Sequence, residues 1–348
     1  MKAFLAGLAL ATMLLASVAS AAGNAQRTRV IHTKAIIESF ALGGDRLAYD
    51  LRGFTSCNRV LVLNLRTNKT SRVSGKQTCN ADITSTGHGV RELAVARTRL
   101  AWIINQGGNT ESDDYLYIVS LPRPKERRLA SAMRFGEPGG RQAGKWIGNL
   151  VASGNLLAVN RWTTNQDGAT TSSGVDRIVG NRLRRIVSSR KAILGQAADN
   201  GRIAVLYEDS TVELYNANGA RLRTVKVTSG TEIALRGDNL LVLTETRTLE
   251  LYSARTGALV RTWPLLALAP GELDTFGGLA IYVAHPKYTV ESFKVHALNL
   301  RTGKDVVVAS GNWQLRQSAE LDAAGLLYAR DRHNLVLVPF KQVLAAVS

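Results

Sequence analysis

The stretch DNLLVLTETRTLELYSARTGALVRTWP, residues 238–264, sets the pattern that the rest of the chain repeats. It contains an apolar run, a polar break, an alternating segment at 248–253, a turn at 255–257 and a final apolar segment at 259–263. Alternation of apolar and polar residues indicates a strand with one buried face. The stretch therefore predicts consecutive antiparallel β-hairpins.

An apolar strand that follows a tight polar or glycine turn recurs seven times along the chain. Its leading residues are Leu47, Leu100, Leu156, Ile203, Leu240, Leu279 and Leu326. The spacings between them are 53, 56, 47, 37, 39 and 47 residues. A period of about 46 residues is typical of a β-propeller, in which each blade is a four-stranded sheet.

The two ends of the chain predict how the repeat closes. After Phe340 only KQVLAAVS remains, which is too short for a turn and a fourth strand. A spare strand, RTRVIHT, precedes the first repeat at residues 27–33. We expect it to complete the last blade and remove an open sheet edge. The predicted fold is all-β: a single domain over residues 23–348, a seven-bladed β-propeller with four-stranded blades, closed by this N-terminal strand.

Several hairpins resemble those of known propellers. The segments ELYSARTGALVRTW, HALNLRTGKDVVVA and LVLNLRTNKTSRVS are similar to hairpins of bacterial secreted propellers of the TolB-like, YVTN and quinoprotein-like kinds. The pair GDRLAYDLR and VLVLNLRT is the most TolB-like. The chain has no Trp-Asp dipeptide and lacks the repeated tryptophans of a quinone-docking propeller. The resemblance therefore implies a fold, and it implies no cofactor.

The first residues predict export. Met1-Lys2 is a short positive start, residues 3–18 are largely apolar, and Ala19-Ser20-Ala21 is a small-x-small cleavage pattern. The alternative is a membrane anchor, but a run of about 16 residues is short for a membrane span. We expect a signal peptide at residues 1–22, no transmembrane span after its cleavage, and a secreted or periplasmic location.

The charge of the chain leaves two interpretations open. Lys and Arg total 44 against 27 Asp and Glu, a formal net charge of +17. An excess of this size favours an anionic polymer, a glycan or an envelope protein as the partner. The alternative is an arginine-rich solvated surface without a partner. Only RPKERR at residues 123–128 is locally dense, and it lacks the interleaved aromatics that single-stranded nucleic acid requires.

The residues that usually carry chemistry are few. Cys57 and Cys79 are the whole cysteine supply and predict a disulfide in an oxidising compartment. The alternative, a two-cysteine metal site, is disfavoured because no histidine lies between them. No two histidines have a zinc-ligand spacing and no GxSxG motif occurs. We predict no metal and no cofactor, and the sequence leaves enzymatic activity uncertain.

Loop length points to one face of the propeller. The long connections are predicted at 79–90, 106–114, 133–144, 161–173 and 285–292, and all open on the same face. Long polar loops gathered on one rim favour binding, with neutral insertion as the alternative. The candidate contacts are His88, Arg91, Asn109, Asp113, Asp114, Arg134, Arg141, Arg161, Trp162, Asp167 and Tyr288.

Two functions follow from this face. The first is a binding or scaffold module for an anionic or glycan-bearing envelope partner, with Trp162 either stacked on a sugar or capping the core. The second is a glycan hydrolase or lyase, which requires converging carboxylates. Asp113, Asp114, Glu137 and Asp167 are the candidates for that role.

Overall fold

The computed structural model describes residues 27–53, 56–75, 87–108, 110–136, 141–265, 270–285, 292–312, 315 and 318–348. Most of this part of the chain is β-strand, and one short helix, α2 (Phe340–Ala346), follows the last strand. No helix within these residues has the length and apolar character needed to cross a membrane. The fold is therefore all-β, as predicted.

Five of the sheets have four antiparallel strands each. Four of the five are built from consecutive strands in chain order. Their strands are β2 (Ile36–Gly43), β3 (Arg46–Gly53), β4 (Ser56–Asn64) and β5 (Lys69–Arg72); β14 (Ile193–Asp199), β15 (Arg202–Tyr207), β16 (Thr211–Asn216) and β17 (Arg221–Lys226); β18 (Gly230–Arg236), β19 (Asn239–Thr244), β20 (Thr248–Ser253) and β21 (Leu259–Pro264); and β22 (Pro270–Phe276), β23 (Leu279–Ala284), β24 (Phe293–Asn299) and β25 (Asp305–Gly311).

The fifth four-stranded sheet joins the two ends of the described chain. Its order is β1-β28-β27-β26, so the first strand pairs antiparallel with the last. Its strands are β1 (Arg29–His32), β26 (Ala319–Asp322), β27 (Gly325–Asp331) and β28 (Asn334–Pro339). The residues after Phe340, which the sequence left without a strand, form α2 and place Val343 in the core.

The remaining sheet has eight strands, in the order β13-β12-β11-β10-β9-β8-β7-β6. It consists of two four-stranded units that β9 and β10 join, because Arg134 of β9 pairs with Gly144 of β10. Its strands are β6 (Gly87–Val95), β7 (Arg99–Gly107), β8 (Glu111–Ser120), β9 (Arg127–Gly136), β10 (Gln142–Ser153), β11 (Leu156–Thr164), β12 (Thr170–Val179) and β13 (Arg182–Arg185).

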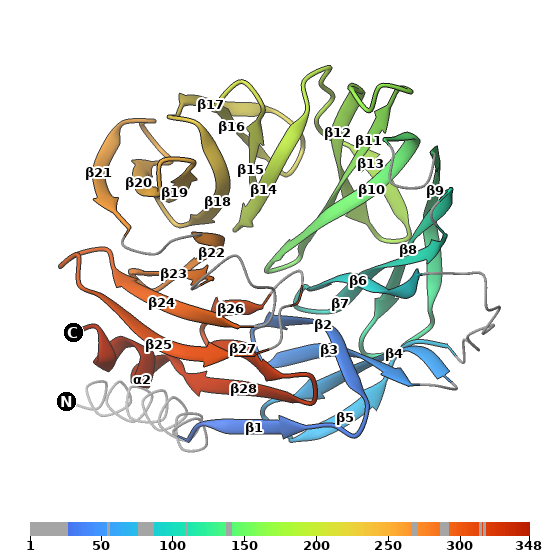
Figure 1. Cartoon of the computed structure of the whole chain (residues 1–348), viewed down its shortest axis with the longest axis horizontal. Helices are drawn as coiled ribbons and strands as arrows, with labels where there is room; N and C mark the ends of the chain where they lie inside the picture. Colours follow the sequence, from blue (N-terminus) through green and yellow to red (C-terminus); the bar gives the residue numbers. More distant parts are fainter. Residues whose placement is uncertain are drawn as a thin grey trace, which may run out of the picture.

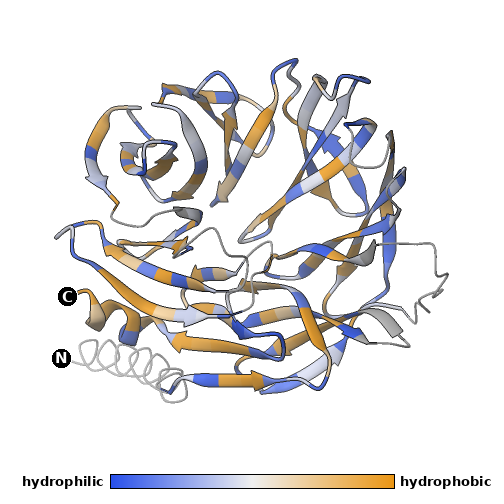
Figure 2. Ribbon diagram, in the orientation of Figure 1, coloured by the Kyte–Doolittle hydropathy of each residue, from blue (hydrophilic) through white to orange (hydrophobic). Residues whose placement is uncertain are grey.

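The sheets lie around a common centre, in a propeller-like arrangement (Figure 1). Contacts between inner strands run from β2 to β6, β10, β14, β18, β22 and β26, and from β26 back to β2. Hydrophobic residues run along the strands, with hydrophilic residues at many turns (Figure 2). All seven leading residues of the predicted repeat lie in second strands of these units, with 3% exposure or less.

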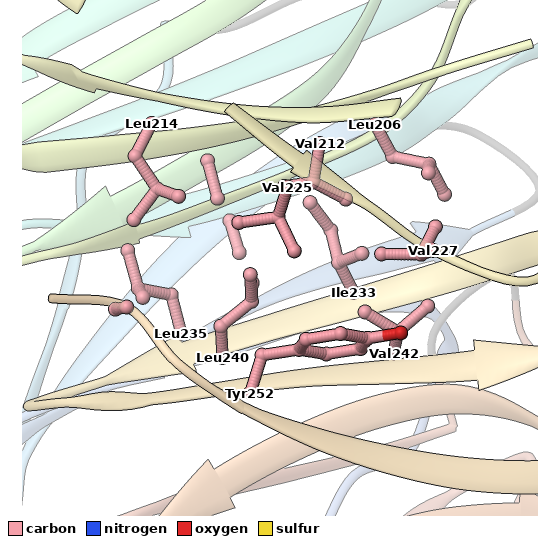
Figure 3. Close-up of a cluster of buried hydrophobic side chains, with 13 residues drawn as sticks. Leu206, Val212, Leu214, Val225, Val227, Ile233, Leu235, Leu240, Val242 and Tyr252 are labelled. Carbon is pink, nitrogen blue, oxygen red and sulfur yellow. The ribbon is translucent and has the colours of Figure 1, made fainter. Parts of the chain in front are cut away.

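Apolar clusters fill the space between neighbouring sheets. Figure 3 shows one, in which Leu206, Val212 and Leu214 face Ile233 and Leu240 of the next sheet. Burial of such side chains stabilises by about 1.5–3 kcal/mol each. Carboxylates and arginines make the polar connections across the same gaps. The carboxylates accept hydrogen bonds from backbone N–H groups, and the arginines donate to backbone carbonyl oxygens.

Carboxylates connect the inner strands. The Glu92 side chain accepts a hydrogen bond from the backbone N–H of Leu150 (2.8 Å), and Asp274 accepts one from Leu321 (2.7 Å). Glu272 accepts from Ser318 in the same way. Burial raises the pKa of Glu272 to about 7 and that of Asp274 to about 6, because desolvation disfavours the charged form.

Arginines connect the turns of neighbouring sheets. The guanidinium of Arg46 donates to the carbonyl oxygen of Arg97 (2.8 Å), and that of Arg99 donates to Asn155 (2.8 Å). Outer strands repeat the contact: the acceptors of Arg29, Arg177, Arg223 and Arg261 are the carbonyl oxygens of Leu65, Ala217, Arg255 and Arg301. Part of the arginine excess therefore holds neighbouring sheets together.

Candidate binding site on the eight-stranded sheet

The predicted long loops are largely strand. β9 continues to Gly136 and β10 begins at Gln142, so most of the predicted connection 133–144 is paired backbone. The connection predicted at 161–173 reduces to 165–169, because β11 runs to Thr164 and β12 begins at Thr170. Alternating polar side chains in these segments satisfy a strand with one exposed face as well as they satisfy a loop. The elaborated face is thus an extension of the sheet.

A buried ion cluster fixes this extension from within. The Asp114 side chain is 0% exposed and its Oδ2 lies 2.6 Å from Nη1 of Arg134. Its Oδ1 accepts a hydrogen bond from Nδ2 of Asn105 (2.9 Å) and lies 3.4 Å from Nη1 of Arg91. Removing one member of such a cluster leaves an uncompensated buried charge, so these side chains are strongly constrained.

Arg134 also supports an aromatic stack. Its guanidinium carbon lies 4.1 Å from the ring centroid of Trp146, a cation–π contact. Trp162 stacks on Trp146 from the neighbouring strand, with ring centroids 5.5 Å apart and planes within 7°. Arg134, Trp146 and Trp162 come from three adjacent strands, β9, β10 and β11. The stack therefore crosses the junction between the two four-stranded units.

An open hollow of about 540 Å³ lies beside this stack. Nε1 of Trp146 donates to Oγ1 of Thr164 (2.9 Å), and that hydroxyl donates to the carbonyl oxygen of Gln142 (2.9 Å). Nη1 of Arg141 donates to the carbonyl oxygen of Asp167 (2.6 Å). This bond connects the start of β10 to the turn between β11 and β12. The lining residues are Arg141, Gln142, Trp146, Thr164, Asp167, Gly168 and Ala169.

The hollow offers mixed chemistry. Arg141 supplies a cationic donor, Asp167 an anionic acceptor and Thr164 a hydroxyl, while Trp146 supplies apolar surface. A few polar groups around an aromatic surface are characteristic of sites for small polar ligands. Among the described residues, no set of three His, Cys, Asp or Glu side chains is placed to hold a metal ion. The arrangement suits hydrogen bonding to a neutral or anionic ligand.

The predicted contact residues separate into three groups. Arg141 and Asp167 line the hollow. Asp114 and Arg134 are buried and Arg91 is mostly buried, so they support the site from the protein interior. Trp162 contacts Trp146 and does not line the hollow, which favours the capping interpretation over sugar stacking.

Other predicted residues lie away from the hollow. Asp113 and Asp114 are consecutive on β8, so their side chains project to opposite faces of the sheet and do not converge as a hydrolase pair requires. Arg161 pairs with the buried Asp176. His88 belongs to β6, but its side chain lies outside the described residues. The side chains of Asn109, Glu137 and Tyr288 and the predicted Cys57–Cys79 disulfide also lie outside the described residues.

Gln142, Trp146 and Thr164 line the hollow but were not among the predicted contact residues. The segments KWIG and RWTT each contain a tryptophan after a basic residue, and this shared pattern was the available signal. Whether two tryptophans stack depends on strand register, and Trp146 meets Trp162 because these residues are directly opposite in the β10–β11 ladder. The β10–β11 ladder shifts register between Gly148 and Val151, so this pairing is not readable from local sequence.

Comparisons with known proteins bear on the fold alone. No protein-family model and no curated protein matches the chain. The chain is similar to one in the crystal structure of the mitotic checkpoint complex, with a TM-score of 0.55 and 14% identity, covering 91% of this chain and 93% of that one. It is also similar to the computationally designed Ika8 protein, with a TM-score of 0.48 and 12% identity, covering 88% and 97%. The first likeness agrees with an all-β, propeller-like fold.

Proposed function

We propose that this chain is an exported binding module, a closed seven-bladed β-propeller that holds a glycan of an anionic envelope or extracellular partner in the hollow beside Trp146. Seven four-stranded units, the inner-strand contacts around the centre and the β1–β28 pairing support the closed seven-bladed form. The apolar start of the sequence supports export.

The hollow and its rigid support carry the proposal. Ligand affinity is greatest when the contact groups are fixed before binding, because ordering them costs free energy. Here Trp146 is held between Arg134 and Trp162, and Arg134 is held by the buried Asp114. The polar groups around Trp146 include hydrogen-bond donors and acceptors, which suits the hydroxyls of a sugar. Arg141 favours a sugar that carries an acidic group.

Titration calorimetry of the purified protein against neutral and acidic oligosaccharides tests this function. We expect Arg141→Ala and Thr164→Val each to weaken binding about tenfold, which corresponds to one lost hydrogen bond to a charged or hydroxyl group. Arg255→Ala, an exposed arginine on a distant turn, is the matched control and should bind normally. Binding that survives both hollow variants, or no binding to any oligosaccharide, contradicts the proposal.

A further inference from the structure

Most outer strands of the sheets carry positive charge and no negative charge; the exception among the described outer strands is β25, which contains Asp305. The five strands β5, β9, β13, β17 and β21 contain no Asp or Glu. Each occupies the outer end of its four-stranded unit. Their exposed basic residues are Lys69, Arg72, Arg127, Arg128, Arg182, Arg184, Arg185, Arg221, Arg223, Lys226 and Arg261. The whole chain, by contrast, has 27 acidic residues against 44 basic ones, so both signs were available.

These residues are continuous over three successive sheets. Arg223 of β17 donates to the turn that precedes β21, through the carbonyl oxygen of Arg255. Arg177 of β12, the neighbour of β13, reaches the turn before β17 through Ala217. We call the basic side chains of these strands the basic rim: Arg182, Arg184, Arg185, Arg221, Arg223, Lys226 and Arg261.

Most of the rim charge is not neutralised within the protein. Arg185 pairs with Asp176 (2.9 Å) and Arg221 with Glu213 (2.7 Å). The side chains of Arg182 and Arg184 form no hydrogen bond or ion pair with any residue that the structure describes. Residues two apart on a strand lie on one side about 7 Å apart. The side chains of Arg182 and Arg184 therefore project from the same side of β13 as two neighbouring cations.

Protection of sheet edges explains only part of this pattern. Charged side chains on an outer strand prevent another strand from pairing with it. That protection requires charge, but it does not require seven cations and no anion on three neighbouring strands. Arginine also binds phosphate and carboxylate groups through two parallel hydrogen bonds. The excess of one sign points to a ligand.

We propose that the basic rim binds a flexible linear polyanion that follows the outer strands β13, β17 and β21 around the molecule. These strands belong to sheets at successive positions around the centre, and β17 and β21 lie at the outer edge in Figure 1. A flat membrane reaches one part of such a curved surface at a time, whereas a flexible chain reaches all three strands. The polymer binds through repeated phosphate or carboxylate groups, since the rim lacks exposed aromatic side chains for base stacking.

Fluorescence titrations with long-chain polyphosphate, poly-glutamate and vesicles of anionic phospholipid test this proposal on the full protein. The rim variant is Arg182→Gln/Arg184→Gln/Lys226→Gln. The control variant loses three positive charges elsewhere, through Lys34→Gln/Arg97→Gln/Lys341→Gln, all at exposed positions. Thermal melting verifies that both variants fold.

We expect the protein to bind at least one polymer at low salt, and the rim variant to weaken that binding tenfold or more. The slope of log Kd against log salt should fall by about 2, since each lost contact to a flexible polyanion contributes about 0.7. The control variant should change Kd less than threefold. Equal losses in both variants, no binding to either polymer, or binding to vesicles alone would overturn the proposal. Thr164→Val should bind the polymer normally, which separates this surface from the hollow.

Discussion

Sheets β14–β17 and β18–β21 differ from the eight-stranded sheet mainly in strand length. Their strands have six or seven residues, whereas β7 to β12 have nine to twelve. The buried leading residues are equivalent in both, as Leu156 at 3% and Leu240 at 0% exposure illustrate. The added residues therefore extend one end of the strands without changing the core. A repeat can acquire a site in this way while its folding pattern stays intact.

The two regions also differ in where a buried ion lies. Between β14–β17 and β18–β21 the apolar cluster is accompanied by one buried carboxylate, Asp199 at the end of β14, whose Oδ1 lies 3.6 Å from Nη1 of Arg236 at the end of β18. The extension buries Asp114 with Arg134, and such a pair is often no more stabilising than apolar residues of the same volume. Its value is positional, because the pair fixes the orientation of Arg134 and thereby of Trp146. The predictions below compare the two regions, from the largest expected effect to the smallest.

Deletion of residues 23–34 removes β1 and should destabilise both regions together. The sheet that β1 completes then has an unpaired edge at β28. We expect the melting temperature to fall by about 10 °C or more, since a chain of this size loses roughly 2–4 °C per kcal/mol. A synthetic peptide of the deleted segment should restore part of the loss. An unchanged melting temperature would sink the closed-ring interpretation.

Asp114→Ala should destabilise the extended region by about 3–5 kcal/mol, because it leaves the Arg134 guanidinium buried without a counter-charge. Urea unfolding measures the loss, and amide exchange should locate it in β6–β13. Asp113→Ala is the matched control on the opposite face and should cost less than about 1 kcal/mol, the value of its hydrogen bond from Tyr115. Similar losses in the two variants would remove the positional role of the ion pair.

The inner-strand carboxylates should make the protein less stable as pH rises. The folded-state pKa of Glu272 is about 7, above its usual value of 4.5, so the native state holds this proton more tightly than the unfolded state does. Its contribution is fully present below pH 4.5 and is lost as pH passes through 7. The loss amounts to at most about 3 kcal/mol.

Urea unfolding between pH 4.5 and 8 measures this dependence. Glu272→Gln should flatten it, whereas Glu245→Gln on an exposed turn should leave it unchanged. Glu320 interacts with both Glu272 and Asp274, so the pH dependence that remains in Glu272→Gln comes from Asp274 and Glu320. A wild-type protein that grows more stable over this range contradicts the assignment.

Arg223→Ala should cost about 1 kcal/mol, the usual value of one hydrogen bond, because it removes the connection between β17 and the turn before β21. Arg184→Ala, on the neighbouring rim strand β13 and without a side-chain partner among the described residues, is the control and should melt normally. If both variants melt alike, the arginine connections contribute little beyond solubility.

The sequence predicted the repeat well, because the signal for it is local. A glycine turn such as Gly237-Asp238 requires a positive φ (58° at Gly237), and the apolar run of β19 follows it directly. The inner strands were harder to recognise. β26 (AELD) is short and acidic, and its carboxylates are satisfied by backbone N–H groups of a neighbouring sheet, which carry no sequence signal.

The sequence predicted which part of the chain carries the candidate site, but it did not predict how the site is built. The sequence placed Arg141 and Asp167 in long connections, whereas the structure continues the strands into most of these segments. The pairing of β9 with β10 was not predictable, because it depends on where two sheets meet in space. The arginine excess was likewise ambiguous in sequence. The acceptors of Arg46 and Arg99 are carbonyl oxygens, which every residue provides.

The pairing of β1 with β28 has a consequence for the order of events in folding. Arg29 and its partner Leu337 are separated by 308 positions in the chain, and such distant contacts form slowly. During synthesis, β1 has no partner until β28 has been made. The sheet that contains β1 and β28 can therefore form only after β28 has been made. Products truncated before β28 keep an exposed strand edge that proteases and chaperones can recognise.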